Sequence, residues 1–378
     1  MQINIIGDVI GNSGYCSHIR QFANALYKAG ADVRLDSQKP PGWESQVNDA
    51  ELNMLTKLPD KDRCDIAVTL PHMWPYHLAQ RPAHFIGFLV WEGDSIPPFW
   101  MKHLIDKRVD TVFVPSQHTK DAVLTTFKSC AGLDNIKEGK VTMKDWDKIK
   151  IVPHGVDRSL FFPIEKKKDK FCFLANKGWT KPLTDRGGLQ FIIQAFAAEF
   201  NKNEKVKLLL KVNKSYAPDF DVREAIKQLG ITKPVKERPE ILVTESMVPY
   251  KELNNIYNEG DVFVSASMAE GFNLPVLEGM ACGMPAIVTN FGGHCDFVDK
   301  SNGWKVRTET YHVKDDIQYE GISWGKVHIS CLRKAMRKVF DLHKQGKLER
   351  YKNGALNTSM KYTWDNSAKI ALDIINDL

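Results

Sequence analysis

The first half of the chain alternates short apolar runs with segments whose apolar side chains recur at helical spacing. In one such segment, Tyr15–Ala29, the side chains of Ile19, Phe22, Ala23, Leu26 and Tyr27 fall on one face, and Gly30 follows as a stop signal. A second helix is predicted over His118–Phe127. The apolar runs predict strands at Ile3–Ile6, Val33–Leu35, Ile66–Leu70, Phe85–Val90, Thr111–Val114 and Ile149–Val152.

The second half starts the same alternation again after a pause between Pro153 and Lys170, where Pro163 and a lysine run interrupt the pattern. Its predicted strands are Phe171–Leu174, Lys207–Lys211, Ile241–Val243, Val262–Ala266 and Pro285–Val288. Its predicted helices are Gly188–Phe200, Val222–Leu229, Tyr250–Glu259, Leu274–Cys282, His328–Gln345 and Trp364–Leu378, the last with Ile370, Ala371, Ile374 and Ile375 on one face.

Alternating strands and helices predict an α/β fold of two doubly wound, Rossmann-like domains, each with a parallel sheet covered on both faces. We expect an N-terminal domain over residues 1–160 and a C-terminal domain over residues 168–360. Ligands of such sheets bind at the carboxyl ends of the strands, so a cleft between two facing sheets is the expected site.

Composition narrows the class of protein. Of 378 residues, 43% are hydrophobic and 26% charged, which supports packed cores and excludes a disordered tail. We expect a cytoplasmic protein, because we see no apolar run long enough to span a membrane and no signal peptide at the start. The net charge of +6 suits a protein that holds phosphates or docks peripherally on an anionic surface. Seven scattered cysteines without a CxxC pair argue against a disulfide framework or a zinc site, and we expect no metal.

The most informative stretch runs from Ser265 to Pro285. A strand enters a glycine-containing loop, and the loop enters a helix with Asn273 as the expected N-cap and Pro275 in the first turn. Gly283 then ends the helix. Such a loop directs several backbone N–H groups and the positive end of a helix at one point, which predicts an anion site suited to a diphosphate. The candidates for binding this group are Gly271, Phe272, Asn273 and Leu274.

Two carboxylates in this stretch have different expected roles. Glu270 lies in the loop, where a sugar beyond the phosphates would sit, and Glu278 lies about one turn into the helix, where it could accept two vicinal hydroxyls. Because 46 of the 378 residues are acidic, an acid eight positions after a glutamate arises by chance about once in eight. The pair is informative only within the whole strand–loop–helix string.

This string resembles the E-x7-E signature of glycosyltransferase family 4, the retaining group 1 transferases with the GT-B fold. It departs from the usual sequence of this motif at Asn273 and Gly279. Asn273 has a Cβ where the usual glycine has none, and we expect this Cβ to change the shape of the pocket at the donor sugar. Further stretches also resemble marks of this family: Gly11–Gly14, Val114–Ser116, Pro153–Asp157, Gly292–Gly293 with Asp296, and Trp91–Glu92 with Pro97–Trp100.

The resemblance implies roles for individual residues. An arginine and a lysine after the first strand of the second domain would grip the diphosphate; these roles fall to Lys177 and Arg186, with Lys181 as an alternate. Glu270 would orient the sugar and Glu278 the ribose. The remaining donor-side candidates are Gly14, whose loop would close over the phosphates, and Met247 and Val248, where base contacts are expected.

On the acceptor side the candidates are Glu92, His154 and Trp74. Each has an ordinary structural alternative: Glu92 as a carboxylate that caps the next helix, His154 as a hydrogen-bonded loop histidine, and Trp74 as core packing within the ring-rich stretch Leu70–His77. The resemblance also implies that the terminal helix, residues 362–378, crosses back to the first domain.

The implied reaction transfers a sugar from a UDP- or GDP-linked donor with retention and without an enzymatic nucleophile. The nucleotide sugar is a co-substrate, and no tightly bound cofactor is expected. The acceptor stays open among glycans, lipids, small molecules and modified nucleic acids. Three alternatives also stay open: an epimerase or phosphorylase on the same fold, a non-catalytic binding subunit, and a dehydrogenase that binds NAD at the first glycine loop, Gly7–Gly14.

Overall fold

The computed structural model describes residues 2–11, 13–37, 54, 62–130, 146–214, 217–246, 248–314 and 316–378. The chain divides into two compact units. Unit 1 comprises Met1–Gly155, His312–Ser323 and Tyr362–Leu378, and unit 2 comprises Val156–Tyr311 and Trp324–Lys361.

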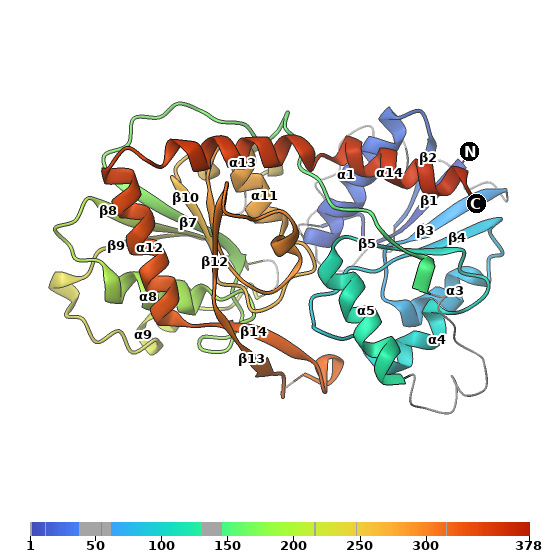
Figure 1. The fold of residues 1–378 in the computed structure, drawn as a ribbon, viewed down its shortest axis with the longest axis horizontal. Helices are drawn as coiled ribbons and strands as arrows, with labels where there is room; N and C mark the ends of the chain where they lie inside the picture. The colour runs from blue at the N-terminus through green and yellow to red at the C-terminus, as the bar shows by residue number, and fades with distance from the viewer. Residues whose placement is uncertain are drawn as a thin grey trace. The chain divides into compact units, whose positions relative to one another are not determined.

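Unit 1 is built on a six-stranded parallel sheet in the order β2-β1-β3-β4-β5-β6 (Figure 1). Its strands are β1 (Gln2–Gly7), β2 (Asp32–Ser37), β3 (Arg63–Ala67), β4 (His84–Phe88), β5 (Thr111–Val114) and β6 (Ile149–Ile151). Its helices are α1 (Gly14–Lys28), α3 (Trp74–Leu78), α4 (Met101–Leu104), α5 (Gln117–Cys130) and α14 (Trp364–Asn376), with 3₁₀ turns η1 (Pro71–Met73), η2 (Pro98–Trp100) and η7 (Ile317–Tyr319).

Helix α1 shows how the apolar pattern becomes packing. Ser13 caps its N-terminus by accepting a hydrogen bond from the N–H of Cys16, and the predicted apolar face is buried. Tyr27 is the exception: 55% of its surface is exposed, so its assignment to the buried face was wrong. Helix α14 packs beside α1, and there Ile370, also predicted to be on the apolar face, is 37% exposed (Figure 1).

Unit 2 contains a second six-stranded parallel sheet, in the order β12-β11-β10-β7-β8-β9 (Figure 1). Its strands are β7 (Phe171–Gly178), β8 (Val206–Asn213), β9 (Glu240–Thr244), β10 (Val262–Ser265), β11 (Ala286–Thr289) and β12 (Gly303–Val306). Its helices are α8 (Leu189–Glu199), α9 (Val222–Gln228), α10 (Leu253–Tyr257), α11 (Leu274–Ala281), α12 (Ile329–Lys344) and α13 (Glu349–Lys361), with 3₁₀ turns η4 (Val235–Glu237), η5 (Tyr250–Glu252) and η6 (Gly293–Asp296).

The strand order of the second sheet reverses at one place. The chain runs from β7 outward through β8 to β9, then returns to the other side of β7 with β10 and continues to β12. The loops after β7 and β10 therefore leave the sheet in opposite directions and open a crevice at their carboxyl ends. This topology places the segments after Gly178 and after Ser265 at the position where ligands of such sheets bind.

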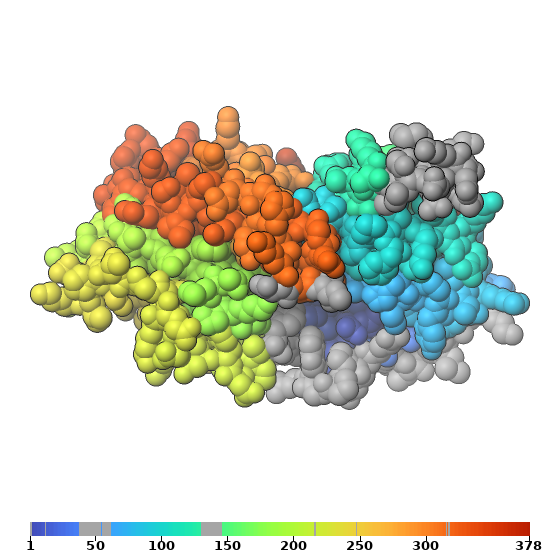
Figure 2. All heavy atoms as spheres, turned by 90° about the horizontal axis from the view of Figure 1, so that it is seen from below, coloured from blue at the N-terminus to red at the C-terminus, as the bar shows by residue number. Residues whose placement is uncertain are grey.

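The two parallel sheets confirm the predicted α/β class of two Rossmann-like folds. Some elements differ from the prediction: β3 ends at Ala67, short of the expected Leu70, and α13 was not predicted. The hairpin of β13 (Thr308–His312) and β14 (Ser323–Val327) was also not predicted, and its orange atoms lie on the face seen in Figure 2. No helix among the described residues combines the length and the apolar character needed to cross a membrane.

Candidate functional site

The ion pair between Lys177 and Glu270 forms the centre of the site. Lys177 lies near the end of β7, and Glu270 lies in the loop after β10, so the strand reversal brings them together. The ammonium Nζ of Lys177 lies 2.7 Å from Oε1 of Glu270 and 2.7 Å from Oδ1 of Asn273. The side chains are 9% and 19% exposed, respectively, so the pair is largely shielded from water.

Glu270 is held in its charged form. Burial by itself raises the pKa of its carboxyl, but the charges of Lys177 and Arg186, with hydrogen bonds from Lys177 and Ser267, lower the pKa to about 2. The hydroxyl of Ser267 donates to Oε1 at 2.7 Å. Glu270 is therefore an anion at neutral pH and has no proton to donate.

Arg186 reaches the site through a tightly folded loop after β7. The carboxylate of Asp185 accepts hydrogen bonds from the N–H groups of Thr180 and Gly187, which closes the loop. Gly188 has φ of +76°, and a Cβ there would lie 2.0 Å from the carbonyl oxygen of Ala266, so only glycine lets this turn rest on the loop after β10. The carbonyl of Arg186 then accepts from the N–H of Met268 at 2.8 Å.

Asn273 occupies the last position before α11 in the left-handed conformation, with φ of +80°. The predicted N-cap position of Asn273 is confirmed, but its side chain makes no capping hydrogen bond to the helix. The amide oxygen accepts from Lys177, and the amide nitrogen donates to Oγ of Ser265 and to Nδ1 of His294. Asparagine tolerates this conformation better than other residues with a Cβ.

The ring of His294 determines which way this amide points. Nε2 lies 2.8 Å from the carbonyl oxygen of Thr289, and because a carbonyl only accepts, Nε2 carries the proton. Nδ1 of a neutral ring is then an acceptor, which orients the amide nitrogen of Asn273 toward His294 and its oxygen toward Lys177. Hydrogen bonds from Thr289 through His294 to Asn273 thus position the ammonium of Lys177.

Two glycines brace the loop that carries Glu270. A Cβ on Gly293 would lie 2.0 Å from the carbonyl oxygen of Gly271, and the N–H of Gly293 donates to the carbonyl of Glu270 at 2.8 Å. Gly292 has φ of +108°, a conformation that favours glycine. The side chain of Phe272 is 2% exposed and packs on Phe297, so it anchors the loop in the core.

Glu278 lies one turn into α11 and is held by two tyrosines. Oε1 accepts from the hydroxyl of Tyr250 at 2.6 Å, and Oε2 accepts from the hydroxyl of Tyr257. Burial raises the pKa of Glu278, although both tyrosine hydrogen bonds and the charge of Lys177 act in the opposite direction. Asn176, the residue before Lys177, donates to the hydroxyl of Tyr257, so hydrogen bonds link Glu278 to the same end of β7 that carries Lys177.

Comparison with known families identifies this part of the chain. Residues 178–316, which include the Arg186 loop, the strands β8 to β12 and α11, match the family model described as glycosyl transferases, group 1. Residues 178–316 are thus similar to a group 1 glycosyltransferase domain. This match confirms the resemblance to the group 1 glycosyltransferases.

Among curated relatives, a probable sucrose-phosphate synthase of Thermosipho melanesiensis is 26% identical over 61% of this chain and 47% of its own length. A D-inositol 3-phosphate glycosyltransferase of Paenarthrobacter aurescens is 28% identical over 39% of this chain and 36% of its own length. The matched segments thus span between about a third and a half of these relatives.

A solved structure of sucrose-phosphate synthase from Thermosynechococcus elongatus superposes on the whole chain with a TM-score of 0.67, covering 98% of that structure at 16% identity. At this identity the similarity concerns the fold alone. It agrees with the two parallel sheets described above and confirms the GT-B fold.

Several donor-side candidates of the glycosyltransferase domain lie outside the central cluster. Lys181 is exposed, and the Glu270 carboxylate is bound by Lys177 and Ser267 and influenced by the charge of Arg186 instead. Val248 follows the edge strand β9, two strands away from β7, and Met247 lies outside the described residues. Leu274 is the first residue of α11 and is partly exposed.

Gly14, the donor-side candidate in unit 1, is the first residue of α1, and a Cβ there would meet nothing within 4 Å. The loop before it is fixed by Arg20, whose Nη1 donates to the carbonyls of Val9 at 2.7 Å and Gly11 at 3.0 Å. Arg20 thus holds Val9 and Gly11 in place, and the start of α1 at Gly14 has open space beside it.

The structure contradicts two acceptor-side candidates. Trp74 is 0% exposed, and a Cβ on Gly87 would lie 2.2 Å from its ring, so the ring packs under β4 and cannot stack on an acceptor. His154 is 4% exposed and packs against His18, Phe88 and Trp364 in the core of unit 1, where it cannot contact an acceptor. For Trp74 the structural alternative of core packing is the one observed. His154, whose alternative was a hydrogen-bonded loop histidine, is packed among rings instead.

Glu92 is 8% exposed, and Oε1 accepts from the hydroxyl of Tyr319 at 2.6 Å. The ring of Tyr319 stacks on Trp91 with a centroid distance of 5.0 Å. Glu92 and Trp91 thus hold Tyr319 in place within unit 1. Glu92 keeps its place among the acceptor-side candidates as a prediction.

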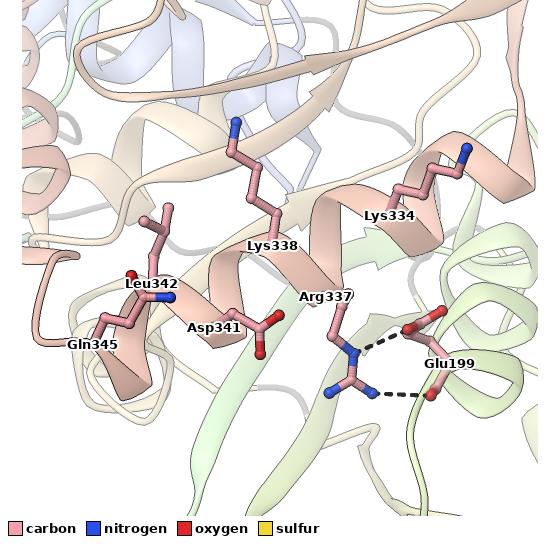
Figure 3. A pocket seen from close by; sticks show the side chains of 7 residues that line it. All are labelled: Glu199, Lys334, Arg337, Lys338, Asp341, Leu342 and Gln345. Carbon is pink, nitrogen blue, oxygen red and sulfur yellow. Dashed lines mark hydrogen bonds and ion pairs between the residues drawn. The ribbon is translucent and has the colours of Figure 1, made fainter.

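A surface hollow of about 410 Å³ lies elsewhere in unit 2, on α12 and the end of α8 (Figure 3). Arg337 spans it by binding both Glu199 and Glu204, and its guanidinium lies over the ring of Phe200. These contacts explain the residues there as packing between α12 and α8, remote in sequence from the signature. Among the described residues, histidine, cysteine and acidic side chains form no group of three that could hold a metal.

Sequence reasoning missed several residues that shape the site: Ser267, His294, Asp185, Tyr250 and Tyr257. One signal was present for the tyrosines, because seven residues separate them and a helix spanning both would place them on one face, two turns apart. His294 had no local signal, because its partner Asn273 lies in a different loop. Asp185 and Ser267 act within their own loops, on Gly187 and Glu270, but no repeat or motif singled them out.

Proposed function

We propose that the protein is a retaining glycosyltransferase that moves a sugar from a UDP- or GDP-linked donor to a hydroxyl acceptor. The convergence of Lys177 and Arg186 on the loop before α11, at the strand reversal, carries this proposal. A nucleoside diphosphate leaving group develops negative charge as its bond to the sugar breaks, and preorganised cations stabilise that charge.

Lys177 suits this role because its ammonium has three N–H donors, and the described contacts use two of them, on Glu270 and Asn273. The third is left for a phosphate oxygen. Backbone N–H groups at the start of α11 add a positive end on the same side of the sheet. Glu270 keeps the ammonium in place before the donor arrives.

The charge state of Glu270 also supports the retaining mechanism. A carboxylate in an ion pair with Lys177 has no proton to donate, and its pairing makes it a poor nucleophile. Its oxygens suit the hydroxyls of the donor sugar. In the proposed reaction, the bond from the anomeric carbon to the diphosphate breaks, and the acceptor oxygen bonds on the same face. The departing phosphate oxygen takes the acceptor proton.

The names of the curated relatives, a sucrose-phosphate synthase and a D-inositol 3-phosphate glycosyltransferase, suggest a first acceptor panel. Sugar phosphates and polyol phosphates offer a hydroxyl together with an anionic group, which also suits the net charge of +6. Neutral sugars complete the panel, and proton NMR of the product reports its anomeric configuration.

The first experiment is a thermal-shift screen of UDP- and GDP-sugars on wild-type protein, Lys177→Met and Glu278→Ala. We expect stabilisation of the wild type by one nucleotide sugar, and loss of most of it in both variants. Lys168→Met is a matched control, because Lys168 pairs with Asp261 at 3.0 Å in the same unit outside the site. The proposal fails if no nucleotide sugar stabilises the wild type while NAD does.

A further inference from the structure

The two tyrosines on Glu278 are not equivalent. Tyr257 is 1% exposed, and its hydroxyl donates to Glu278 while it accepts from Nδ2 of Asn176 at 3.0 Å. Its ring also stacks on Phe263. Tyr257 is therefore part of the packed core and holds one oxygen of the carboxylate from within it.

Tyr250, in contrast, lies on the short 3₁₀ turn η5 and is half-buried. Its ring rests edge-on against Phe161 at a centroid distance of 5.2 Å, and its hydroxyl reaches Oε1 of Glu278 at 2.6 Å. Of the described partners of Glu278, Tyr250 is the one with exposed surface. A ligand that approaches the carboxylate from solvent therefore meets Tyr250 first.

A ribose that binds Glu278 through its vicinal hydroxyls needs an acceptor lone pair on each carboxylate oxygen, in the direction from which it approaches. Oε1 already accepts from the hydroxyl of Tyr250, the partner that has exposed surface. On the basis of the proposed function, we infer that the ribose diol of the nucleotide must displace the hydroxyl of Tyr250 from Oε1 of Glu278. We call this hydrogen bond the latch. Tyr250 thereby sets how strongly the site distinguishes ribonucleotides from nucleotides without the diol.

This inference makes an unusual prediction, because removal of a contact in the donor site improves binding. In Tyr250→Phe the ring still packs on Phe161, but the hydroxyl no longer competes for Oε1. A hydrogen bond to a charged group that is lost on binding corresponds to a change of up to about tenfold in Kd once water partly replaces it in the free protein. A nucleotide without ribose hydroxyls leaves the latch closed, so its affinity should not change.

The test is isothermal titration of UDP and GDP, and of their 2′,3′-dideoxy counterparts, into wild type, Tyr250→Phe and Tyr257→Phe. We expect Tyr250→Phe to bind the ribonucleotide about three- to tenfold more tightly, with the dideoxy analogue within about twofold of wild type. Tyr257→Phe should weaken ribonucleotide binding, because it frees the carboxylate that the ribose needs fixed. Tyr311→Phe, a half-buried tyrosine on β13 outside this site, is the matched control and should change neither.

Weaker ribonucleotide binding in Tyr250→Phe, or an equal change for both kinds of nucleotide, would overturn the latch. The proposed function has a separate readout in Glu278→Gln. If that variant binds UDP and GDP as tightly as wild type does, the nucleoside does not sit on Glu278, and both the donor-site assignment and the latch are refuted. If Glu278→Gln weakens binding but Tyr250→Phe leaves the ratio of the Kd values for ribonucleotide and dideoxynucleotide unchanged, only the latch is refuted.

Discussion

The ion pair of Lys177 and Glu270 allows a quantitative prediction about stability. The pKa of Glu270 falls from an ordinary 4.5 to about 2 in the folded protein. A shift of that size corresponds to about 3 kcal/mol of stabilisation at neutral pH, at about 1.4 kcal/mol per pKa unit. The side chain is 19% exposed, so water screens this interaction only weakly.

The direction of the pH dependence of stability follows from the difference between the folded-state and unfolded-state pKa values of Glu270. The folded-state pKa is lower than the unfolded-state pKa, so this stabilisation is fully present above about pH 5 and is lost as the pH falls toward 2. Glu270→Gln removes the titration. We expect its free energy of unfolding to depend less on pH than that of the wild type between pH 5 and 3.

Lys177→Met leaves Glu270 with Arg186 and Ser267 as its remaining partners. Removing one member of a buried pair costs about 3–5 kcal/mol, because the other charge stays buried. In the double variant Lys177→Met/Glu270→Gln no unpaired charge remains, so we expect a coupling energy of about 2–3 kcal/mol between the two substitutions.

Urea unfolding followed by tryptophan fluorescence at pH 7 and pH 4 measures these quantities. Lys168→Met/Asp261→Asn provides a control cycle on another ion pair of the same unit. A coupling energy at Lys177 and Glu270 below about 0.5 kcal/mol, or an unchanged pH dependence in Glu270→Gln, would refute the reasoning.

Three further predictions concern other contacts. Asn273→Asp should weaken diphosphate binding more than Asn273→Gly does, because it places a second carboxylate beside Lys177 that neutralises the ammonium. Glycine, in contrast, adopts the φ of +80° without adding a charge. Calorimetry with UDP measures the binding of both variants. Gly293→Ala should destabilise the protein by more than about 2 kcal/mol, because its Cβ meets the carbonyl of Gly271. Gly346→Ala, which has a positive φ but open space around it, should cost about 1 kcal/mol when both variants are unfolded in urea. His18→Leu should reduce the loss of stability on acidification below pH 6.5, since burial lowers the pKa of His18 to about 3 and only the unfolded state takes up its proton; an acid titration with the same slope as wild type would contradict this.

The sequence by itself determined the features that depend on neighbours along the chain. The apolar periods predicted the strands Thr111–Val114 and Val262–Ser265 closely, because a strand or helix between close neighbours is set by local spacing and turn chemistry. The string from Ser265 to Pro285 likewise predicted a loop that enters a helix at Leu274. Two alternating runs of this kind were enough for the α/β class.

Only the tertiary structure decided which side chains meet. Trp74 and His154 carried polar and ring chemistry suited to a site, but β4 and α14 bury them. Lys177 and Lys181 are four residues apart and chemically alike, yet only Lys177 lies at the strand reversal beside Glu270. Glu278 gained its tyrosines, and Asn273 its histidine, from segments more than twenty residues away. Such contacts depend on how loops are placed by the packed sheet, and no period or spacing along the chain contains that information.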